Sequence, residues 1–475
     1  FYLPMIVLDA RQCALLDRQG GGNPFQQDRI VICSYQFAAK RADDIARVPW
    51  DLVVIDEAHR LRNVYKKSSK LARTLSDALG AAPKLLLTAT PLQNSLMELY
   101  GLVSVIDERV FGDSATFREQ FTRLLYEQTR NLHLRERLKS VCIRTLRTQV
   151  VEYIPFTRRV PFVQEFSLSD DEQALYDAIS DFLRREKLYS LPASQRMLIT
   201  LVLRKLLASS SFAIAATLRR LIGRLEAMAD ELDFTDEDLE GIEEYEEEWS
   251  EGDAAPADDA GDDEAVDRAL LADELETLRR FADMADAITV NAKGEALLPA
   301  LRLAFDRAQS LGAPRKAVVF TESRRTQQYL YDLLRANGFE GKLALMNGTN
   351  TDPLSTEIYQ DWRNRHAGQE AVTGSRPVDV KAAIVEFFRE QASVLIATEA
   401  AAEGVNLQFC ALVVNYDLPW NPQRVEQRIG RCHRYGQKHD VVVVNFFNKR
   451  NEADKRVVQL LSEKFSLFDG IFGAS

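Results

Sequence analysis

The sequence predicts an α/β fold made of two parallel-sheet lobes with a helical insertion between them. Short apolar runs rich in Val, Ile and Leu occur in two groups, one near the start of the chain and one after Lys316. Segments with helical spacing separate the runs, and this alternation is typical of parallel sheets buried on both faces. A chain of 475 residues also exceeds one ordinary hydrophobic core, so we expect two or three domains.

The first lobe is expected within residues 1–91. Its apolar runs stand at residues 5–8, 30–33, 52–55 and 85–87, and four such runs suit a parallel sheet. Residues 92–229 instead have Leu-rich helical spacing and few helix breakers, so this region is expected to be mostly helical.

Residues 230–299 are expected to form an acidic disordered linker followed by a helix. From Asp230 to Glu264 the chain has 19 acidic residues and no Lys or Arg, with few apolar residues to anchor it. The segment is either a solvated linker or an acidic mimic of DNA. Outside it basic residues outnumber acidic ones, although the whole chain has a net charge of −11. A phosphate-tracking groove is therefore compatible with the composition.

The second lobe is expected at residues 300–475. Strands are predicted at residues 317–320, 343–346, 394–397, 412–416 and 441–444, and helices at 326–337 and 382–390. Residues 349–379 are polar and read as a surface loop, in which Trp362 and Arg363 serve either local packing or a contact with DNA.

Cysteine usage and hydropathy exclude several classes of protein. The five cysteines are scattered with no C-x-x-C pair, which predicts neither a disulfide framework nor a zinc site. No apolar run approaches the roughly 20 residues of a membrane span, and the first four residues lack the basic start of a signal peptide. We therefore expect a cytoplasmic protein without a membrane partner.

Two acids follow the apolar run that ends at Ile55. Ligands of open α/β sheets bind at the carboxyl ends of strands, which is where Asp56 and Glu57 fall. Phosphoryl transfer requires charge neutralisation and positioning, so Asp56 would hold Mg²⁺ and Glu57 would orient the attacking water. The alternative is a buried strand that ends in solvated acids. Thr88 and Thr90 follow the next apolar run, at residues 85–87, and their hydroxyls could interact with these acids.

Three arginines, Arg428, Arg431 and Arg434, recur at spacings of three along a predicted helix near the C-terminus. A planar guanidinium suits phosphate oxygens, so the array indicates a clamp for a nucleoside triphosphate with an arginine finger. The alternative is a solvated basic helix face.

Five motifs occur in order along the chain: DEAHR at 56–60, TATPLQN at 88–94, VVFTES at 318–323, ATEAAAEGVNLQ at 397–408 and QRIGRCHRYGQ at 427–437. This set resembles the Swi/Snf family of superfamily-two ATPases. It is most similar to the bacterial HepA-like branch, which includes helicase-like proteins of phage-defence operons. The resemblance covers nearly the whole chain apart from the acidic segment. It implies two RecA-like lobes that bind one ATP with Mg²⁺ between them, and a protrusion and brace within residues 92–229.

The resemblance also implies roles for individual residues. Asp56 and Glu57 would face the metal and the water, while Arg431 and Arg434 would stabilise the γ-phosphate charge. The residues expected to bind ATP or couple it to DNA are His59, Thr88, Thr90, Gly404, Asn406, Gln427 and Arg428. The family usually has a glycine among the positions of Ala400, Ala401 and Ala402, which weakens the expected backbone contacts there.

The phosphate-cradling pattern G-x-x-x-x-G-K-[ST] does not occur in this sequence. In the family it lies upstream of the strand that contains Ile6, so the chain is expected to be an internal fragment of a longer protein. The expected function of that protein is ATP-dependent translocation on duplex DNA through phosphate contacts, which remodels protein–DNA complexes in phage defence or transcription recycling. A non-catalytic DNA-binding scaffold and a strand-separating helicase are the two alternatives.

Overall fold

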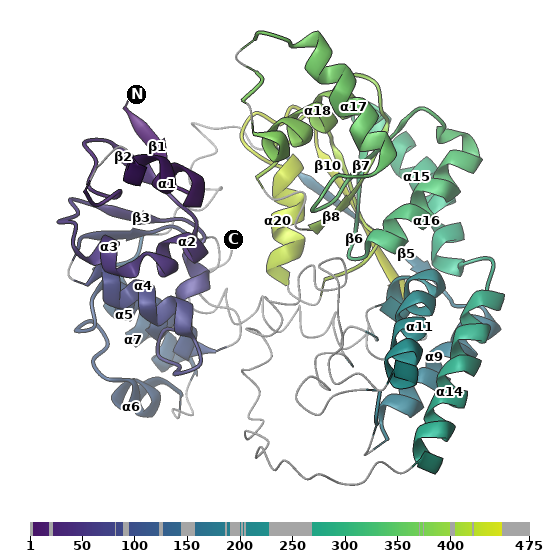
Figure 1. Cartoon of the computed structure of the whole chain (residues 1–475), viewed down its shortest axis with the longest axis horizontal. Coiled ribbons are helices and arrows are strands. Elements are labelled where there is room, and N and C mark those ends of the chain that lie inside the picture. The colour runs from purple at the N-terminus through teal and green to yellow at the C-terminus, as the bar shows by residue number, and fades with distance from the viewer. Residues whose placement is uncertain are drawn as a thin grey trace. The chain divides into compact units, whose positions relative to one another are not determined.

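Parallel strands form the centre of two separate units in the computed structural model (Figure 1). Unit 1 holds the described residues up to position 143, and unit 2 holds those from position 157 onward. The structure describes residues 3–18, 22–80, 82–88, 95–122, 127–143, 157–185, 188–190, 200, 203, 206–227, 268–369, 371–373, 375–399, 404–419 and 422–448.

Unit 2 is built on a six-stranded sheet in which all neighbouring strands are parallel. From one edge to the other the order is β5 (Arg159–Phe166), β10 (Val441–Asn448), β9 (Leu412–Asn415), β6 (Ala317–Thr321), β8 (Val394–Thr398) and β7 (Leu343–Met346). The four strands from β9 to β7 are fully buried apolar runs, as expected for strands covered on both faces.

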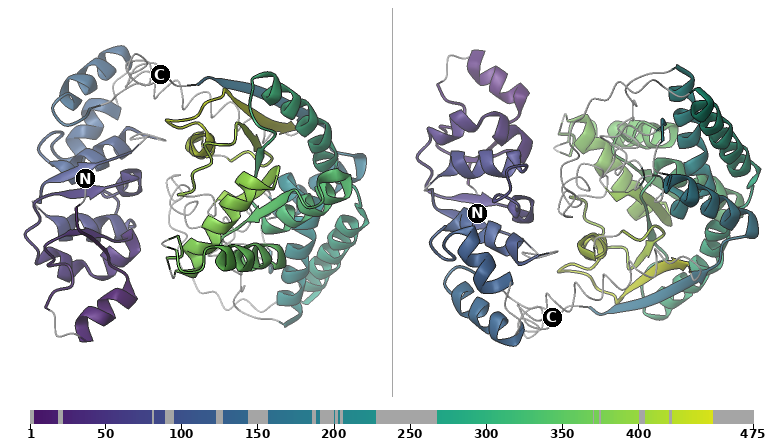
Figure 2. Two further views of the ribbon diagram at one scale, coloured as in Figure 1. Left: turned by 90° about the horizontal axis from the view of Figure 1, so that it is seen from above. Right: turned by 90° about the horizontal axis from the view of Figure 1, so that it is seen from below.

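Helices cover both faces of this sheet (Figures 1 and 2). One face packs against α15 (Ala292–Ser310) and α16 (Arg324–Leu334), and the other packs against α17 (Pro353–Arg365), α18 (Arg376–Glu390) and α20 (Pro422–Cys432). A π-helical turn at Arg335–Phe339 continues α16. Alternate residues of the strands from β10 to β7 therefore enter two separate cores, which is why these strands are mostly apolar.

A third apolar core lies among helices beside the sheet of unit 2. It joins α9 (Asp170–Leu183), α11 (Ser211–Ala227) and α14 (Arg268–Ala287). Helix α9 begins at a capping box, in which Ser169 Oγ accepts from the Glu172 amide and the Glu172 carboxylate accepts from the Ser169 amide. Glu172 also accepts a hydrogen bond from the Ala292 amide, which ties this helical group to the start of α15.

Unit 1 contains two pairs of parallel strands with helices around them. The first pair is β1 (Met5–Val7) with β2 (Ile30–Ile32), and the second is β3 (Val53–Ile55) with β4 (Lys84–Leu86). The helices of this part are α1 (Ala10–Arg18), α2 (Tyr35–Lys40), α3 (Ala42–Ala46), the 3-10 turn η1 (Ala58–Leu61) and α4 (Lys70–Leu79). They share one core with the strands.

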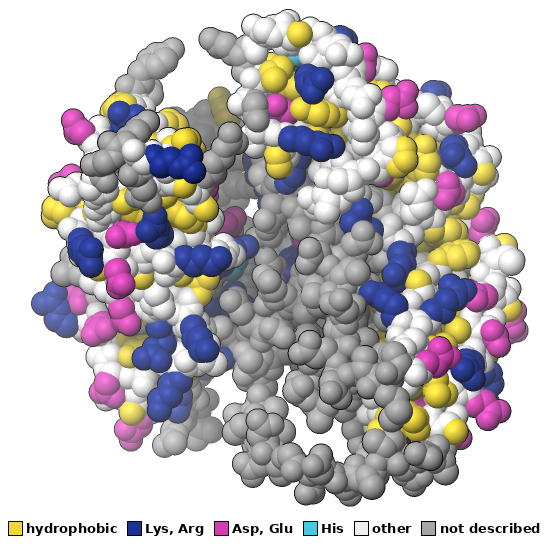
Figure 3. Space-filling model, in the orientation of Figure 1, with side chains coloured by type: hydrophobic (Ala, Val, Ile, Leu, Met, Phe, Trp, Pro, Cys, Tyr) yellow, Lys and Arg dark blue, Asp and Glu magenta, His cyan; other side chains and the backbone are white. Residues whose placement is uncertain are grey.

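The opposite side of these strands carries apolar side chains that face solvent. In the strand register Met5 lies beside Ile30, Val7 beside Ile32, and Val54 beside Leu85, and all six side chains are exposed. Figure 3 shows hydrophobic side chains on the surface of unit 1. This arrangement differs from unit 2, where both faces of the parallel sheet are covered.

The remainder of unit 1 is helical and has its own aromatic core. It consists of α5 (Leu96–Ile106), α6 (Ser114–Phe117), a π-helical turn (Arg118–Thr122) and α7 (Glu127–Leu138). Phe117 lies at the centre, with its ring centroid 4.8 Å from that of Phe111 and 4.9 Å from that of Phe121. Gly101 of α5 packs directly on the Arg62 carbonyl oxygen, a position that leaves no space for a Cβ atom.

The predicted α/β class is confirmed and strands form in both groups, but the four runs of the first group make two separate two-stranded pairs instead of one sheet. Two other elements also differ from expectation. Strand β5 lies in a region expected to be mostly helical and forms an edge of the unit 2 sheet. Helix α17 occupies 13 residues of the stretch 349–379 that was expected to be a loop, and Trp362 in it is buried. The acidic segment 230–264 lies outside the described residues. Within the described part of the chain, no helix is both long enough and apolar enough to cross a membrane.

Candidate functional site

Two exposed carboxylates lie at the carboxyl end of β3 in unit 1. Asp56 and Glu57 follow Ile55 directly, and both side chains are exposed. Glu57 adopts a left-handed backbone conformation with φ of 50°, and its amide donates to Asp56 Oδ1 over 3.0 Å. This conformation is uncommon for a residue other than glycine and is enriched at functional sites.

Backbone hydrogen bonds fix this turn against the end of β4. The Leu87 amide donates to the Ile55 carbonyl over 2.9 Å, and the Ala58 amide donates to the Leu87 carbonyl over 2.9 Å. Thr88 follows Leu87 and therefore lies next to the acidic turn, as predicted from the sequence. Thr90 lies outside the described residues.

His59 and Tyr35 each contact the acidic turn. His59 Nδ1 lies 3.3 Å from Glu57 Oε2, which suits an orienting role for this histidine. The Tyr35 hydroxyl donates to the Asp56 carbonyl oxygen over 2.7 Å, and the Arg60 guanidinium lies over the Tyr35 ring at 5.8 Å. Burial raises the pKa of Tyr35, so the hydroxyl stays protonated and keeps donating at all physiological pH values.

The donor set of this turn fits Mg²⁺ better than a metal held entirely by protein. Among the residues that the structure describes, no group of three or more His, Cys, Asp or Glu could hold a metal ion. Mg²⁺ is commonly bound by one or two carboxylates, with phosphate oxygens and water filling its remaining positions. An exposed Asp56 carboxylate at a strand end is compatible with that mode of binding.

In unit 2 the loop that carries Gly404 and Asn406 is attached to the end of α20. The Leu407 amide donates to the Arg431 carbonyl over 3.0 Å, and Gln408 Nε2 donates to the Tyr435 carbonyl over 2.7 Å. Gly404 has a φ of 75°, and the exposed Asn406 caps the following turn through the Gln408 amide. Two predicted groups that are well separated in sequence are thus adjacent in space.

The three arginines of the array have different surroundings. Arg434 is exposed and its Nε donates to the Gly430 carbonyl over 2.7 Å, while Arg431 and Gln427 are half-buried. Arg428 has only 1% of its side chain exposed. Arg434 and Arg431 are therefore the members of the array whose side chains keep some exposure, whereas Arg428 is buried.

The guanidinium of Arg428 is surrounded by acceptors at the carboxyl edge of the sheet. Its Nε donates to Glu399 Oε2 over 2.6 Å, and its Nη1 donates to the Asp417 carbonyl oxygen over 2.6 Å. The Phe320 ring lies 5.2 Å from it. This burial differs from the predicted nucleotide contact and indicates that Arg428 fixes α20 to the sheet.

A buried ion pair beside this arginine was not predicted. Asp417, which follows β9, accepts from Lys293 Nζ over 2.7 Å, from Thr321 Oγ1 over 2.7 Å and from Ser209 Oγ over 2.8 Å. Lys293 also donates to the Ala208 carbonyl over 3.0 Å. The network joins the helical group to the sheet. An acid directly after an apolar run, as at Asp56, was the only signal in the sequence.

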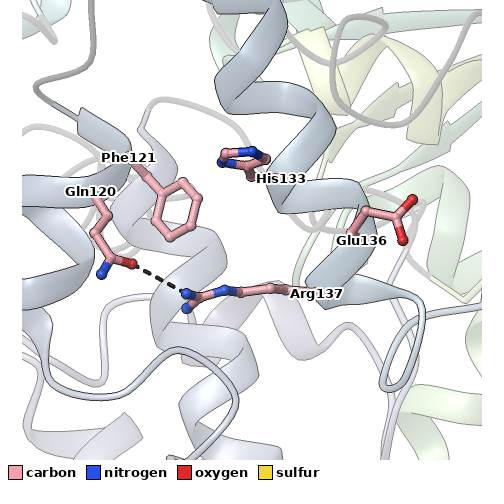
Figure 4. Close-up of a pocket in the computed structure, with 5 residues that line it drawn as sticks. All are labelled: Gln120, Phe121, His133, Glu136 and Arg137. Carbon is pink, nitrogen blue, oxygen red and sulfur yellow. Dashed lines mark hydrogen bonds between the residues drawn. The ribbon is translucent and has the colours of Figure 1, made fainter.

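A separate cavity of about 510 Å³ lies in the helical part of unit 1 (Figure 4). Arg137 Nη2 donates to Gln120 Oε1 over 3.3 Å, and its guanidinium lies 5.3 Å from the Phe121 ring centroid. His133 and Glu136 complete the lining. None of these residues belongs to the acidic turn or to the arginine array.

Models of two domain families match this chain. The SNF2-related domain matches residues 17–221, and the helicase conserved C-terminal domain matches residues 302–436. The first match contains the acidic turn. The second contains the Gly404 loop and the arginine array.

Two relatives align with nearly all of this chain, which covers a smaller share of their own length. The ATP-dependent helicase YqhH of Bacillus subtilis is 30% identical over 452 residues, covering 94% of this chain and 65% of that protein. The ISWI chromatin-remodeling complex ATPase CHR17 of Arabidopsis thaliana is 24% identical, covering 92% of this chain and 32% of that protein. The chain thus spans less than two thirds of these relatives.

The SWI2/SNF2 ATPase core of Sulfolobus solfataricus in complex with dsDNA aligns over 99% of this chain and 77% of that chain, at 16% identity and a TM-score of 0.32. The family assignment depends instead on the two domains, which occur in order and contain the acidic turn and the arginine array. By these features the chain belongs to the Swi/Snf family of superfamily-two ATPases.

Proposed function

We propose that the protein containing this chain is a DNA-dependent ATPase that translocates on duplex DNA and remodels protein–DNA complexes. One observation carries this proposal: unit 1 presents the exposed acids Asp56 and Glu57 directly after β3. Ligands of α/β sheets bind at the carboxyl ends of strands, and phosphoryl transfer uses acids there for the metal and the water. Unit 2 carries the opposite charge, Arg431 and Arg434, at and just after the end of α20.

The chemistry assigned to each residue follows from its surroundings. Mg²⁺ bound with ATP would supply charge neutralisation at the phosphates, and Asp56 would hold it. Glu57 would orient the attacking water, because its carboxylate is exposed and its position is fixed by the left-handed turn and by His59. Arg431 and Arg434 would stabilise negative charge that develops on the γ-phosphate.

Coupling to DNA is assigned to the loop that carries Gly404 and Asn406. Its hydrogen bond from the Leu407 amide to the Arg431 carbonyl gives a short path between a DNA-facing loop and the arginine array. The DNA contact would be made with phosphates, since a motor must hold every sequence alike. A cytoplasmic location, and partners in phage defence or transcription, are parts of the same proposal.

Two alternative functions would give different experimental results. A DNA-binding scaffold would bind duplex DNA without turnover, and a strand-separating helicase would release single strands. Displacement of a triplex-forming oligonucleotide by the full-length protein tests the translocase directly. We expect ATP-dependent release of the third strand from an intact duplex. Release of duplex strands under the same conditions would favour the helicase, and binding without hydrolysis would favour the scaffold.

A further inference from the structure

The first residue of β5 contacts the arginine-bearing segment of unit 2 on both sides of Arg431. One contact is with Glu426, which lies on α20 before Arg431, and the other is with His433, which follows the last residue of α20. The segment between them also carries Arg428, the residue that fixes α20 to the sheet.

Arg159 makes both contacts with one guanidinium group. Its Nη1 donates to Glu426 Oε1 and Oε2, each over 2.7 Å, and its Nε donates to His433 Nδ1 over 3.1 Å. An arginine fork can hold two acceptors at fixed angles, whereas a lysine ammonium lacks that planar geometry. Arg159 therefore fixes the position of α20 relative to β5.

The histidine contact fixes the backbone as well as the side chain. His433 Nε2 lies 2.7 Å from the Thr157 carbonyl oxygen, and only 4% of His433 is exposed. Because Nδ1 accepts from Arg159, the proton of the neutral ring is placed on Nε2, which donates to Thr157. The residues just ahead of β5 are thus tied to the segment that ends in Arg434.

Strand β5 is itself held along its whole length. It pairs with β10 in parallel from Arg159 opposite Val441 to Phe166 opposite Asn448. The Arg158 amide donates to Asp440 Oδ1 over 2.8 Å, and the Val441 amide donates to the Arg158 carbonyl over 2.8 Å. Arg159 accordingly projects from a fixed backbone.

We propose that Arg159 is a positioning residue that holds Arg431 and Arg434 in place for ATP hydrolysis. It lies where the chain has just entered unit 2 from unit 1, because the division between the units falls between residues 149 and 150. The contact therefore joins β5, the first described strand of unit 2, to the arginine array. This inference rests on the proposed function, since it assigns the two arginines to turnover.

If Arg159 only stabilised the fold, its replacement would have no more effect on the arginine array than the loss of a similar surface ion pair elsewhere. The side chains of Arg159 and Glu426 are 32% and 39% exposed, and ion pairs at such positions contribute little to stability. Arg365 on α17 provides a matched control, because its side chain is 39% exposed and it donates to Asp361 over 2.9 Å and to Glu386 over 2.7 Å. It touches neither α20 nor the Gly404 loop in any of these contacts.

The first measurement is hydrogen exchange of the amides in residues 422–436 of the 475-residue chain, without nucleotide or DNA. We expect Arg159→Gln to speed exchange there by about tenfold through local opening, and Arg365→Gln to leave it unchanged. Arg159→Lys keeps the charge without the planar fork, so its exchange rate should be intermediate. This variant can still be measured if Arg159→Gln does not fold. Equal exchange in the wild type and both Arg159 variants would overturn the proposal.

The second measurement is DNA-stimulated turnover of the full-length protein. Arg159→Gln should lower kcat by about tenfold with less than about twofold change in the KM for ATP, because misplacing a transition-state group affects turnover more than binding. Glu426→Gln should act similarly, and the double variant should lose little more than either single variant. Turnover of Arg159→Gln equal to that of Arg365→Gln would refute positioning. A wild type without DNA-stimulated turnover would instead refute the proposed function, and the exchange result would still decide whether Arg159 holds α20.

Discussion

Lys293 Nζ lies 2.7 Å from Asp417 Oδ1, and both side chains are buried where the helical group of unit 2 meets the sheet. Thr321 and the Glu322 amide donate to the other carboxylate oxygen of Asp417 over 2.7 and 3.0 Å. An ion pair so enclosed depends on both partners, because either charge alone would be buried without compensation.

Replacing Lys293 by Met should lower the free energy of unfolding by about 3–5 kcal/mol, since it leaves the Asp417 charge unpaired. Adding Asp417→Asn should recover part of that loss, because the unpaired charge is then removed. Urea denaturation followed by circular dichroism measures both effects. A double variant less stable than Lys293→Met would contradict the assignment.

The same pair predicts opposite pH dependence in the wild type and in Lys293→Met. Burial alone would raise the pKa of Asp417, but the Lys293 charge and the hydrogen bonds from Lys293, Thr321 and the Glu322 amide lower it below its ordinary value. This stabilisation is present above the unfolded pKa of about 3.9 and is lost as the pH falls through the lower folded value. Without Lys293 burial raises that pKa, so acidification from neutral pH should stabilise the variant. Parallel stability curves for the two proteins would exclude this account.

Glu57→Gln in the full-length protein should reduce DNA-stimulated turnover by roughly 10³-fold or more, because the amide cannot accept the proton of an oriented water. Nucleotide binding and thermal stability should change little, since the side chain is exposed. Fluorescent-nucleotide titration and steady-state turnover on one preparation check this. Unchanged turnover would remove Glu57 from the site.

Arg431→Lys keeps the charge but not the planar fork, so it should cut turnover by about 10²-fold while DNA affinity stays nearly the same. If Arg431 instead contacts the DNA backbone, affinity should fall modestly at low salt and turnover per bound enzyme should be maintained. Measuring both quantities at saturating DNA separates these two roles.

Deletion of residues 230–264 removes 19 acidic residues and no basic ones. If that segment competes with DNA, its deletion should tighten duplex binding and steepen the salt dependence of binding, because more counterions are then displaced. Identical salt titrations of the two proteins would leave the segment as a linker.

Gly101→Ala should destabilise unit 1 by about 1–3 kcal/mol, because the added methyl group overlaps the Arg62 carbonyl oxygen and forces the backbone to shift. Gly223→Ala on α11 is the matched control, since nothing lies within 4 Å of its added Cβ. That change should stabilise by about 0.5–1 kcal/mol through helix propensity. Similar effects of the two substitutions on the unfolding midpoint would show that the contact at Gly101 is unimportant.

Buried parallel strands were predictable because they are continuous apolar runs, as at residues 343–346 and 394–398. Strand β5 was missed because it is an edge strand that contains a proline and polar residues at Arg159, Gln164 and Glu165, so it is not a continuous apolar run. Helix α17 was missed because its outer face is polar, although Asp352 before Pro353 is a normal helix start.

The candidate site also has some features that the sequence predicts and others that it does not. The acids after β3 were predictable from their position at a strand end, which depends only on local sequence. Which arginine of the array is buried was not predictable, since spacing along a helix does not reveal that Glu399 and the Asp417 carbonyl lie opposite Arg428. The contacts of Arg159 with Glu426 and His433 join residues more than 260 positions apart, and no local pattern marks them.

The exposed apolar side chains on the strands of unit 1 have a practical consequence for handling the protein. Met5, Ile32 and Val54 are among these side chains, and exposed apolar surface of this kind favours association that increases with protein concentration. A preparation in which these side chains meet water is therefore expected to associate as it is concentrated. Purification at low concentration with a mild detergent would counter that association.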